Sequence, residues 1–320
     1  MIKKTALFFF KLFISIALFI GLQQLIERKT LGFCLTKIQT EDLPYQQQWE
    51  ASHCSEEKQQ QIRNLLSQPF YLMGVGSECF AFASKDGQAV IKFFKLDQMR
   101  PVYFNRGLFG EDYTAFAGTI SRHPLTHVVL PFPLQQGLKR VLGIREFRIQ
   151  RTFHSIKLAY DELREETGLL YLHLNPTDHL SQTLTLYDGN GICHEVDLDS
   201  TRFFLQKRAT PLEMHFRLLQ SNKRHEDTKK SIDSLVHLII HRCQKGLADR
   251  DPFNKNLGFI DNQAMEIDTG SFHKDERMKE PWIYKQELFY VTLELRSWLK
   301  KHYPEMAGYL EKKIAQEIAS

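Results

Sequence analysis

The sequence predicts an α+β fold in two lobes, a small antiparallel β-sheet lobe followed by a mainly helical lobe, behind an N-terminal transmembrane helix. Three observations carry this prediction. Residues 71–95 alternate apolar and small side chains around two turn signals, as adjacent antiparallel strands do. Residues 231–246 place apolar side chains at a helical spacing. Residues 6–22 are almost entirely apolar and follow a basic start.

The bulk composition is that of an ordinary globular protein. The chain has 320 residues, of which 42% are hydrophobic and 25% are charged, enough for one large or two modest domains. A net charge of +4 is too small to indicate nucleic-acid binding, and we expect no nucleic-acid partner. The five cysteines are scattered without a C-x-x-C pair, which argues against both a disulfide framework and a zinc site.

Residues 1–30 are predicted to anchor the protein in a membrane. A spanning helix needs about 20 mostly apolar residues, and the apolar run at 6–22 reaches this length only if Lys11 snorkels to the surface. A cleaved signal peptide and an interfacial helix are the alternatives, but no A-x-A-like cleavage site follows. We expect a single-pass anchor, and therefore a membrane as partner. The sequence does not determine on which side of the membrane the folded domain lies. The glutamine-rich residues 31–66 are predicted to form a stalk.

Residues 67–208 are predicted to form the sheet lobe, which contains a possible phosphate site. Gly74 and Gly76 lie in a turn between two strands, where glycine lets backbone amides approach a phosphate closely. Lys92 lies in the middle of the apolar strand at 89–95. A lysine in such a place is expensive to bury unless it meets an anion.

The sheet lobe is also predicted to contain an insertion at about 99–154. A basic run from Lys139 to Lys157 overlaps its end. The run is either a solvated face or a patch for an anionic membrane surface or an acidic substrate.

Residues 209–320 are predicted to form the helical lobe. The helix at 231–246 leads directly into an acidic loop, in which Asp251 and Asn256 are separated by four residues. Asp268 follows after a predicted hairpin. An acid, an amide and a second acid at these intervals suggest chemistry around a metal-bound phosphate.

Together these motifs resemble the protein kinase-like superfamily, in an atypical bacterial-type form with a minimal C-terminal lobe. The glycine turn and the later V-I-K resemble the glycine-rich loop and lysine strand of that family, and D-R-D-P-F-N-K-N resembles its loop H-R-D-x-x-x-x-N. The resemblance implies ATP and Mg²⁺ as cofactors. It implies that Lys92 holds the nucleotide phosphates and Asp251 is the catalytic base, with Asn256 and Asp268 as metal ligands.

The sequence departs from the family pattern at two places. The third family glycine falls near Cys79, and Asp249 replaces the histidine, a structural position that steadies the loop. Asp249 with Asn254 has the same spacing as the chosen pair, but the apolar residues after Asn256 favour the register that begins at Asp251.

Two further sets of residues follow from the resemblance alone. The family lysine pairs with a glutamate of the following helix, here predicted at 155–168, where Glu162 and Glu166 are one turn apart and the choice stays open. The last strand of the first lobe runs into a hinge whose backbone binds adenine, and this places Gln206 and Lys207 near the nucleotide.

The expected function is therefore that of a membrane-anchored kinase, an ATP- and Mg²⁺-dependent phosphotransferase. Only 52 residues follow Asp268, which leaves no room for the several helices that hold peptides in protein kinases. The acceptor is expected to be a hydroxyl of a small molecule, glycolipid or protein that the sequence does not identify. A nucleotide-binding regulatory module at the membrane without turnover is the alternative.

Overall fold

The computed structural model of the chain describes residues 2–39, 45–51, 55–96, 150–252 and 254–319, with side chains from residue 11 onward. Most of the predicted insertion at about 99–154 and most of its basic run lie outside these described residues.

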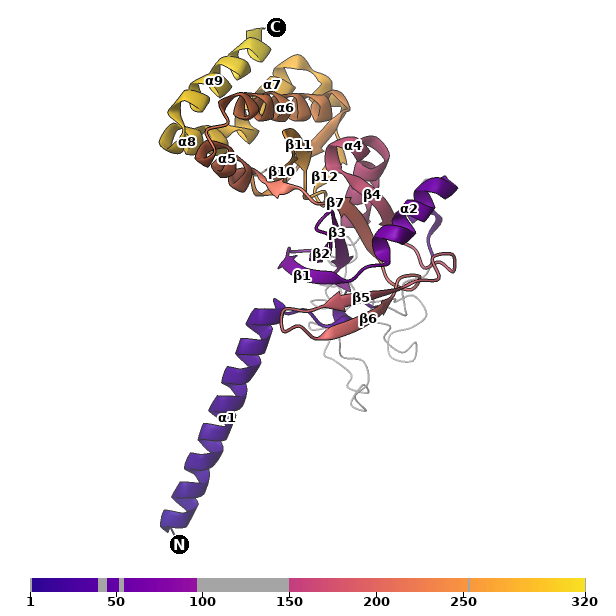
Figure 1. Ribbon diagram of the computed structural model, residues 1–320, viewed down its shortest axis with the longest axis vertical. Coiled ribbons are helices and arrows are strands. Elements are labelled where there is room, and N and C mark those ends of the chain that lie inside the picture. The colour runs from indigo at the N-terminus through magenta and orange to yellow at the C-terminus, as the bar shows by residue number, and fades with distance from the viewer. Residues whose placement is uncertain (1, 40–44, 52–54, 97–149, 253, 320) are drawn as a thin grey trace, which may run out of the picture.

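A curled seven-stranded sheet forms the centre of the first half of the described chain (Figure 1). Its strand order is β4-β7-β3-β2-β1-β5-β6. Neighbouring strands run antiparallel except β1 and β5, which pair in parallel, so the predicted purely antiparallel sheet is corrected at this point. The strands are β1 (Phe70–Val75), β2 (Cys79–Ser84), β3 (Ala89–Phe94), β4 (Leu169–His173), β5 (Thr183–Tyr187), β6 (Cys193–Asp197) and β7 (Phe203–Lys207).

Both faces of this sheet are covered. On one face, aromatic side chains that alternate along β2 and β3, such as Phe82 and Phe93, pack with side chains of β5 and β7. On the other face, Phe94 and Phe204 pack against a helix that covers residues 150–162. A short helix, α4 (Arg164–Thr167), follows it and ends at Gly168, whose φ of +63° is the left-handed conformation typical of a helix C-terminus.

The second half of the described chain is mainly helical. Its core forms around α6, whose apolar stripe, including Ile232 and Leu235, is fully buried. A three-stranded sheet in the order β11-β10-β8 packs beside α6 and α5. Residues 281–302 form two helices, because α7 ends at Val291 and α8 begins at Leu293. The bounds are α5 (Leu212–Ser221), α6 (His225–Gln244), α7 (Pro281–Val291), α8 (Leu293–His302), α9 (Pro304–Ala319), β8 (Thr210–Pro211), β10 (Leu257–Ile260) and β11 (Gln263–Glu266).

The predicted transmembrane helix is wrong. A long helix, α1 (Ile2–Thr30), does project from the molecule (Figure 1). Among the residues whose side chains are described, however, no helix combines the length and the apolar character needed to cross a bilayer. The fold class is therefore corrected to a mixed α/β architecture. The predicted single-pass membrane localisation is contradicted by the same finding.

Part of the predicted stalk at 31–66 packs onto the sheet. Phe33 contacts the rings of Phe80 and Phe82 edge-on, with centroids 5.3 and 5.0 Å apart. Ile62, on α2 (Glu56–Leu66), is also buried in this core. The chain directly after α1 is thereby fixed to the sheet.

The end of α1 rests on the turn between β5 and β6 so closely that the turn requires a glycine. A Cβ atom added to Gly189 would lie 1.7 Å from the carbonyl oxygen of Lys29. We expect Gly189→Ala to lower the free energy of unfolding by about 1–3 kcal/mol, the usual cost of overpacking, as measured by urea denaturation. Gly308→Ala is the control, because a Cβ there meets no atom within 4 Å and alanine favours the helix. Equal stability of Gly189→Ala and the wild type would contradict the prediction.

Candidate functional site

The acidic loop predicted from sequence lies between β9 (Leu247–Asp249) and β10. The backbone N–H of Asp251 donates to Asp249 Oδ1 at 2.9 Å. Asn256 Nδ2 donates to the backbone oxygen of Asp251 at 2.6 Å and to its Oδ2 at 3.1 Å. The side chain of Asp251 is 39% exposed, whereas that of Asp249 is fully buried. Only Asp251 can therefore meet a ligand from solvent, and this geometry favours the register of Asp251 with Asn256.

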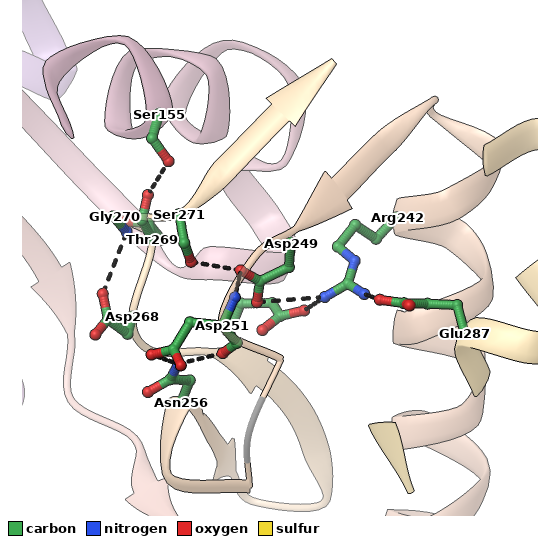
Figure 2. A network of polar contacts seen from close by, with 11 residues as sticks. Ser155, Arg242, Asp249, Asp251, Asn256, Asp268, Thr269, Gly270, Ser271 and Glu287 are labelled. Atoms are coloured by element: carbon green, nitrogen blue, oxygen red, sulfur yellow. Dashed lines mark hydrogen bonds and ion pairs between the residues drawn. The ribbon is translucent and has the colours of Figure 1, made fainter. Parts of the chain in front are cut away.

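Asp268 lies next to this loop through backbone contacts (Figure 2). The carbonyl oxygen of Asn256 accepts hydrogen bonds from the N–H groups of Ile267 at 2.7 Å and of Asp268 at 3.4 Å. The Asp268 side chain is exposed, and its Oδ1 accepts from the Gly270 N–H at 3.2 Å. The side chains of Asp251, Asn256 and Asp268 thus gather at one place, although they come from two separate segments.

Lys92 reaches the same place from the sheet. Its Nζ atom donates to the carbonyl oxygen of Ile267 at 2.5 Å, directly before Asp268. Burial lowers the pKa of Lys92, while the nearby Asp268 carboxylate opposes this change. The contact joins residues 175 positions apart in the sequence, so the fold brings Lys92 next to Asp268.

The oxygen atoms of Asn256 and Asp268 suit a magnesium ion. Because the Asn256 amide nitrogen is held by Asp251, its orientation is set and Oδ1 points away from that contact. Mg²⁺ commonly takes one or two protein oxygen ligands and fills its remaining positions with water and phosphate oxygens. No group of three or more His, Cys, Asp or Glu side chains with metal-site geometry occurs among the described residues. Asn256 and Asp268 could thus supply two oxygen ligands to such an ion.

The glycine turn lies at the tip of the β1–β2 hairpin. The N–H of Gly76 donates to the oxygen of Cys79 at 2.9 Å, and Lys95 Nζ donates to the Gly76 oxygen at 2.6 Å. A Cβ atom on Gly74 would meet nothing within 4 Å. Gly74 belongs to β1, where it pairs with Ala81 at a bulge, so only Gly76 lies in the predicted turn. A Cβ atom on Gly76 would lie 3.9 Å from the Cys79 oxygen. Burial raises the pKa of the Cys79 thiol and the Asp268 carboxylate adds to this increase, so this end of the hairpin lies near Asp268.

Neither candidate glutamate pairs with Lys92. Glu162 Oε1 accepts from Lys274 Nζ at 3.0 Å, and this hydrogen bond lowers the pKa of the glutamate. Glu166 Oε1 lies 2.9 Å from His241 Nε2. Both side chains thus engage the helical part of the molecule, and the carboxylate that acts on Lys92 is Asp268.

The two hinge candidates have structural partners. Gln206 is buried, and its Nε2 donates to the carbonyl oxygens of Thr167 at 2.6 Å and Glu266 at 3.2 Å. The backbone N–H of Lys207 donates to the oxygen of Gly168 at 2.8 Å. The Gln206 side chain and the Lys207 amide hydrogen are therefore engaged within the chain and are not free to bind a nucleotide base.

No protein-family model matches this chain. A search of curated proteins likewise finds no relative. The site must accordingly be interpreted from its own residues.

Several residues at the site had no signal in the sequence. Lys255 Nζ lies 3.5 Å from Asp251 Oδ2 and adds an exposed cation beside this acid. Ser155, the first residue of the helix predicted at 155–168, lies inside the helix at 150–162, and its Oγ donates to the carbonyl oxygen of Thr269 at 2.6 Å. Ser271 Oγ donates to Asp249 Oδ1. The contacts of Ser155 and Ser271 join segments distant in sequence, so no local pattern indicates them. Only the spacing of Lys255, four residues after Asp251, could have indicated a partner.

Proposed function

We propose that the protein is an ATP- and Mg²⁺-dependent phosphotransferase, a kinase-like enzyme that transfers a phosphoryl group to a hydroxyl acceptor. The observation that carries the proposal is the convergence of Lys92, Asp251, Asn256 and Asp268, which come from three separate segments. A cation, an exposed carboxylate and two metal-type oxygen ligands are what phosphoryl transfer requires.

Each residue has a role that its surroundings support. Asp251 is half-exposed and held by Asn256, so it is placed to accept a proton from an acceptor hydroxyl. Lys92 lies beside Asp268, where its side-chain nitrogen would contact phosphate oxygens. Asn256 and Asp268 would hold Mg²⁺, which supplies charge neutralisation at the phosphates when it is bound.

The acceptor is a hydroxyl of a small molecule, glycolipid or protein. Its class stays open in this proposal. The described chain after Asp268 consists of β12 (Phe272–Lys274), which pairs with β9, a short 3-10 helix at Glu276–Lys279 and the three helices α7, α8 and α9. The C-terminal helix α9 packs on α6, and α8 packs on α9. They contribute to the core and supply no residue to the site around Asp251.

A nucleotide titration tests the proposal directly. We expect Mg·ADP to raise the melting temperature of the wild type, since a ligand at 100 times its Kd stabilises by about 2.7 kcal/mol. Asp268→Asn should lose the Mg²⁺-dependent part of this increase, because it removes the charged ligand. The control is Asp261→Asn, an exposed turn position with a φ of +54°, which asparagine tolerates. An equal Mg²⁺-dependent shift in Asp268→Asn would contradict the metal assignment.

A nucleotide-binding module without turnover is the second candidate. It is favoured by one observation, that Glu162 and Glu166 pair with Lys274 and His241 rather than with Lys92. A kinase-like enzyme needs its lysine aligned by a glutamate. Nucleotide binding by the wild type without Mg²⁺-dependent ATP hydrolysis would favour this module over the enzyme.

A further inference from the structure

We propose that Arg242 is a positioning residue, which fixes Asp251 relative to Asp268 by binding the buried carboxylates of Asp249 and Glu266. This inference rests on the proposed function for its catalytic consequence, but its structural content does not depend on nucleotide binding.

Arg242 lies in the last turn of α6 and is almost completely buried (Figure 2). Its Nη1 donates to Glu266 Oε1 at 2.7 Å, and its Nη2 donates to Glu287 Oε1 at 2.6 Å. Asp249 Oδ2 lies 3.8 Å from Nη1. One guanidinium therefore faces three carboxylates from three elements: β9, β11 and α7. Arginine suits this task, because its planar fork presents donors in fixed directions.

The first of these carboxylates controls the loop of the candidate base. Asp249 Oδ1 accepts from the Asp251 N–H at 2.9 Å and from the Ser271 hydroxyl. The Arg250 N–H donates to the oxygen of Ser271 at 3.3 Å. Asp249 therefore holds the segments of Asp251 and Ser271 together. A change in the orientation of the Asp249 side chain would move Asp251.

The second carboxylate controls the segment that carries the candidate metal ligand. Glu266 ends β11, opposite Leu257, and is followed by Ile267 and Asp268. Its carboxylate Oε2 has no hydrogen-bond partner among the described residues, so the bond from Arg242 is the one that directs it. The position of Glu266 therefore sets where the chain leaves β11 toward Asp268.

The charges explain why the arrangement needs the guanidinium. Asp249 and Glu266 are buried carboxylates, and a buried charge is costly unless it is paired. Loss of the guanidinium would therefore displace both side chains, which releases the loop on one side and the β11 end on the other. Glu287, which is 17% exposed in its side chain, anchors the guanidinium to α7. A buried ion pair is by itself weak evidence that it stabilises the fold. The role of Arg242 follows from the geometry of its contacts instead, because they join the loop of Asp251 to the segment of Asp268.

The test combines hydrogen exchange with turnover. Arg242→Lys keeps the charge but cannot bridge Glu266 and Glu287 with two fixed donors. We expect amide exchange in peptides covering 247–251 and 268–274 to rise about tenfold, while exchange in β1–β3 stays unchanged. We expect kcat for Mg²⁺-dependent ATP hydrolysis to fall by about 10²-fold with the KM for ATP within about twofold, as for a misplaced catalytic group.

A second pair of variants keeps the test decisive if Arg242→Lys does not fold. Glu287→Ala removes the anchor on α7, and Glu287→Gln restores an oxygen acceptor at the same place. We expect the alanine variant to change in the same directions and the glutamine variant to recover toward the wild type. Gln286→Ala, an exposed neighbour on the same helix, is the matched control.

The outcomes separate this inference from the proposed function. Unchanged exchange at 247–251 in a folded Arg242→Lys protein overturns the positioning role. If that variant does not fold, Glu287→Ala behaving like Gln286→Ala in exchange overturns it equally. A wild type that neither binds nor hydrolyses Mg·ATP sinks the proposed function, while the exchange data still decide whether Arg242 holds Asp251.

Discussion

Asp251→Asn is expected to lower the kcat of Mg²⁺-dependent ATP hydrolysis by about 10²–10⁴-fold, the usual contribution of a general base. An amide cannot accept the proton of an attacking hydroxyl or water. The asparagine oxygen can still accept the hydrogen bond from Asn256 Nδ2, so the loop keeps its shape. We therefore expect the affinity for Mg·ADP, measured by calorimetry, to stay within about threefold of the wild type.

The exposed turn residue Asp261 again provides the matched control, since Asp261→Asn makes the same chemical change in the next hairpin. Turnover of Asp251→Asn within tenfold of the wild type would remove Asp251 from its role as base. If the wild type itself binds Mg·ADP but shows no turnover, the binding module becomes the better description, and the effect of Asp251→Asn on affinity becomes the informative measurement.

Local periodicity was enough to predict most strands and helices. The alternation in residues 70–95 gave β1, β2 and β3, and the apolar stripe at 231–246 gave most of α6. The parallel pairing of β1 with β5 could not be predicted in this way, because it depends on where the β5–β6 hairpin docks. The membrane anchor was predicted from apolar content that the described part of α1 does not sustain over a bilayer thickness.

The candidate site shows the same division between local and distant information. Asp251, Asn256 and Asp268 could be found because loop spacing is a local property of the chain. Arg242 could not, because a basic residue in the last turn of a helix is ordinarily a solvated partner of the helix dipole. Its burial depends on Glu287, which lies 45 positions later.

The predicted lysine–glutamate pair illustrates a further limit. Glu162 and Glu166 lie one turn apart on the predicted helix, and sequence leaves open which way that helix is rotated. In the structure the helix is interrupted at Leu163, before α4 begins. Glu162 pairs with Lys274, and Glu166 pairs with His241. Their partners belong to the helical half, so helix periodicity alone carries no signal for them.

Two buried histidines are expected to destabilise the folded state at acid pH, with a contribution of about 4 kcal/mol at pH 5. Burial lowers the pKa of His173 to about 4 and that of His215 to about 4. His173 uses both ring nitrogens, toward the Thr201 oxygen at 2.8 Å and the Thr177 hydroxyl at 3.0 Å. His215 bonds Ser231 at 2.8 Å. The folded state therefore excludes a proton that the unfolded chain takes up.

The direction of this pH effect follows from linkage. An unfolded histidine has a pKa of about 6.5, so each contribution is complete above that pH and is lost progressively as the pH falls toward 4. At pH 5 the loss is about 2 kcal/mol for each ring. Burial raises the pKa of Glu266 to about 7 and also raises that of Glu287, which favours the folded state over the same range. The prediction therefore concerns the difference between the wild type and histidine variants.

Urea denaturation at pH 7 and pH 5 measures this difference. The double variant with His173→Gln and His215→Gln should lose about 4 kcal/mol less than the wild type between these two pH values, because glutamine does not titrate. His237→Gln changes an exposed ring on α6 and should keep the wild-type pH dependence. If the double variant and the wild type lose stability in parallel, the two rings are protonated in the folded protein. The acid lability must then come from other groups, such as the hydrogen-bonded carboxylate of Asp199, whose pKa is lowered in the folded state.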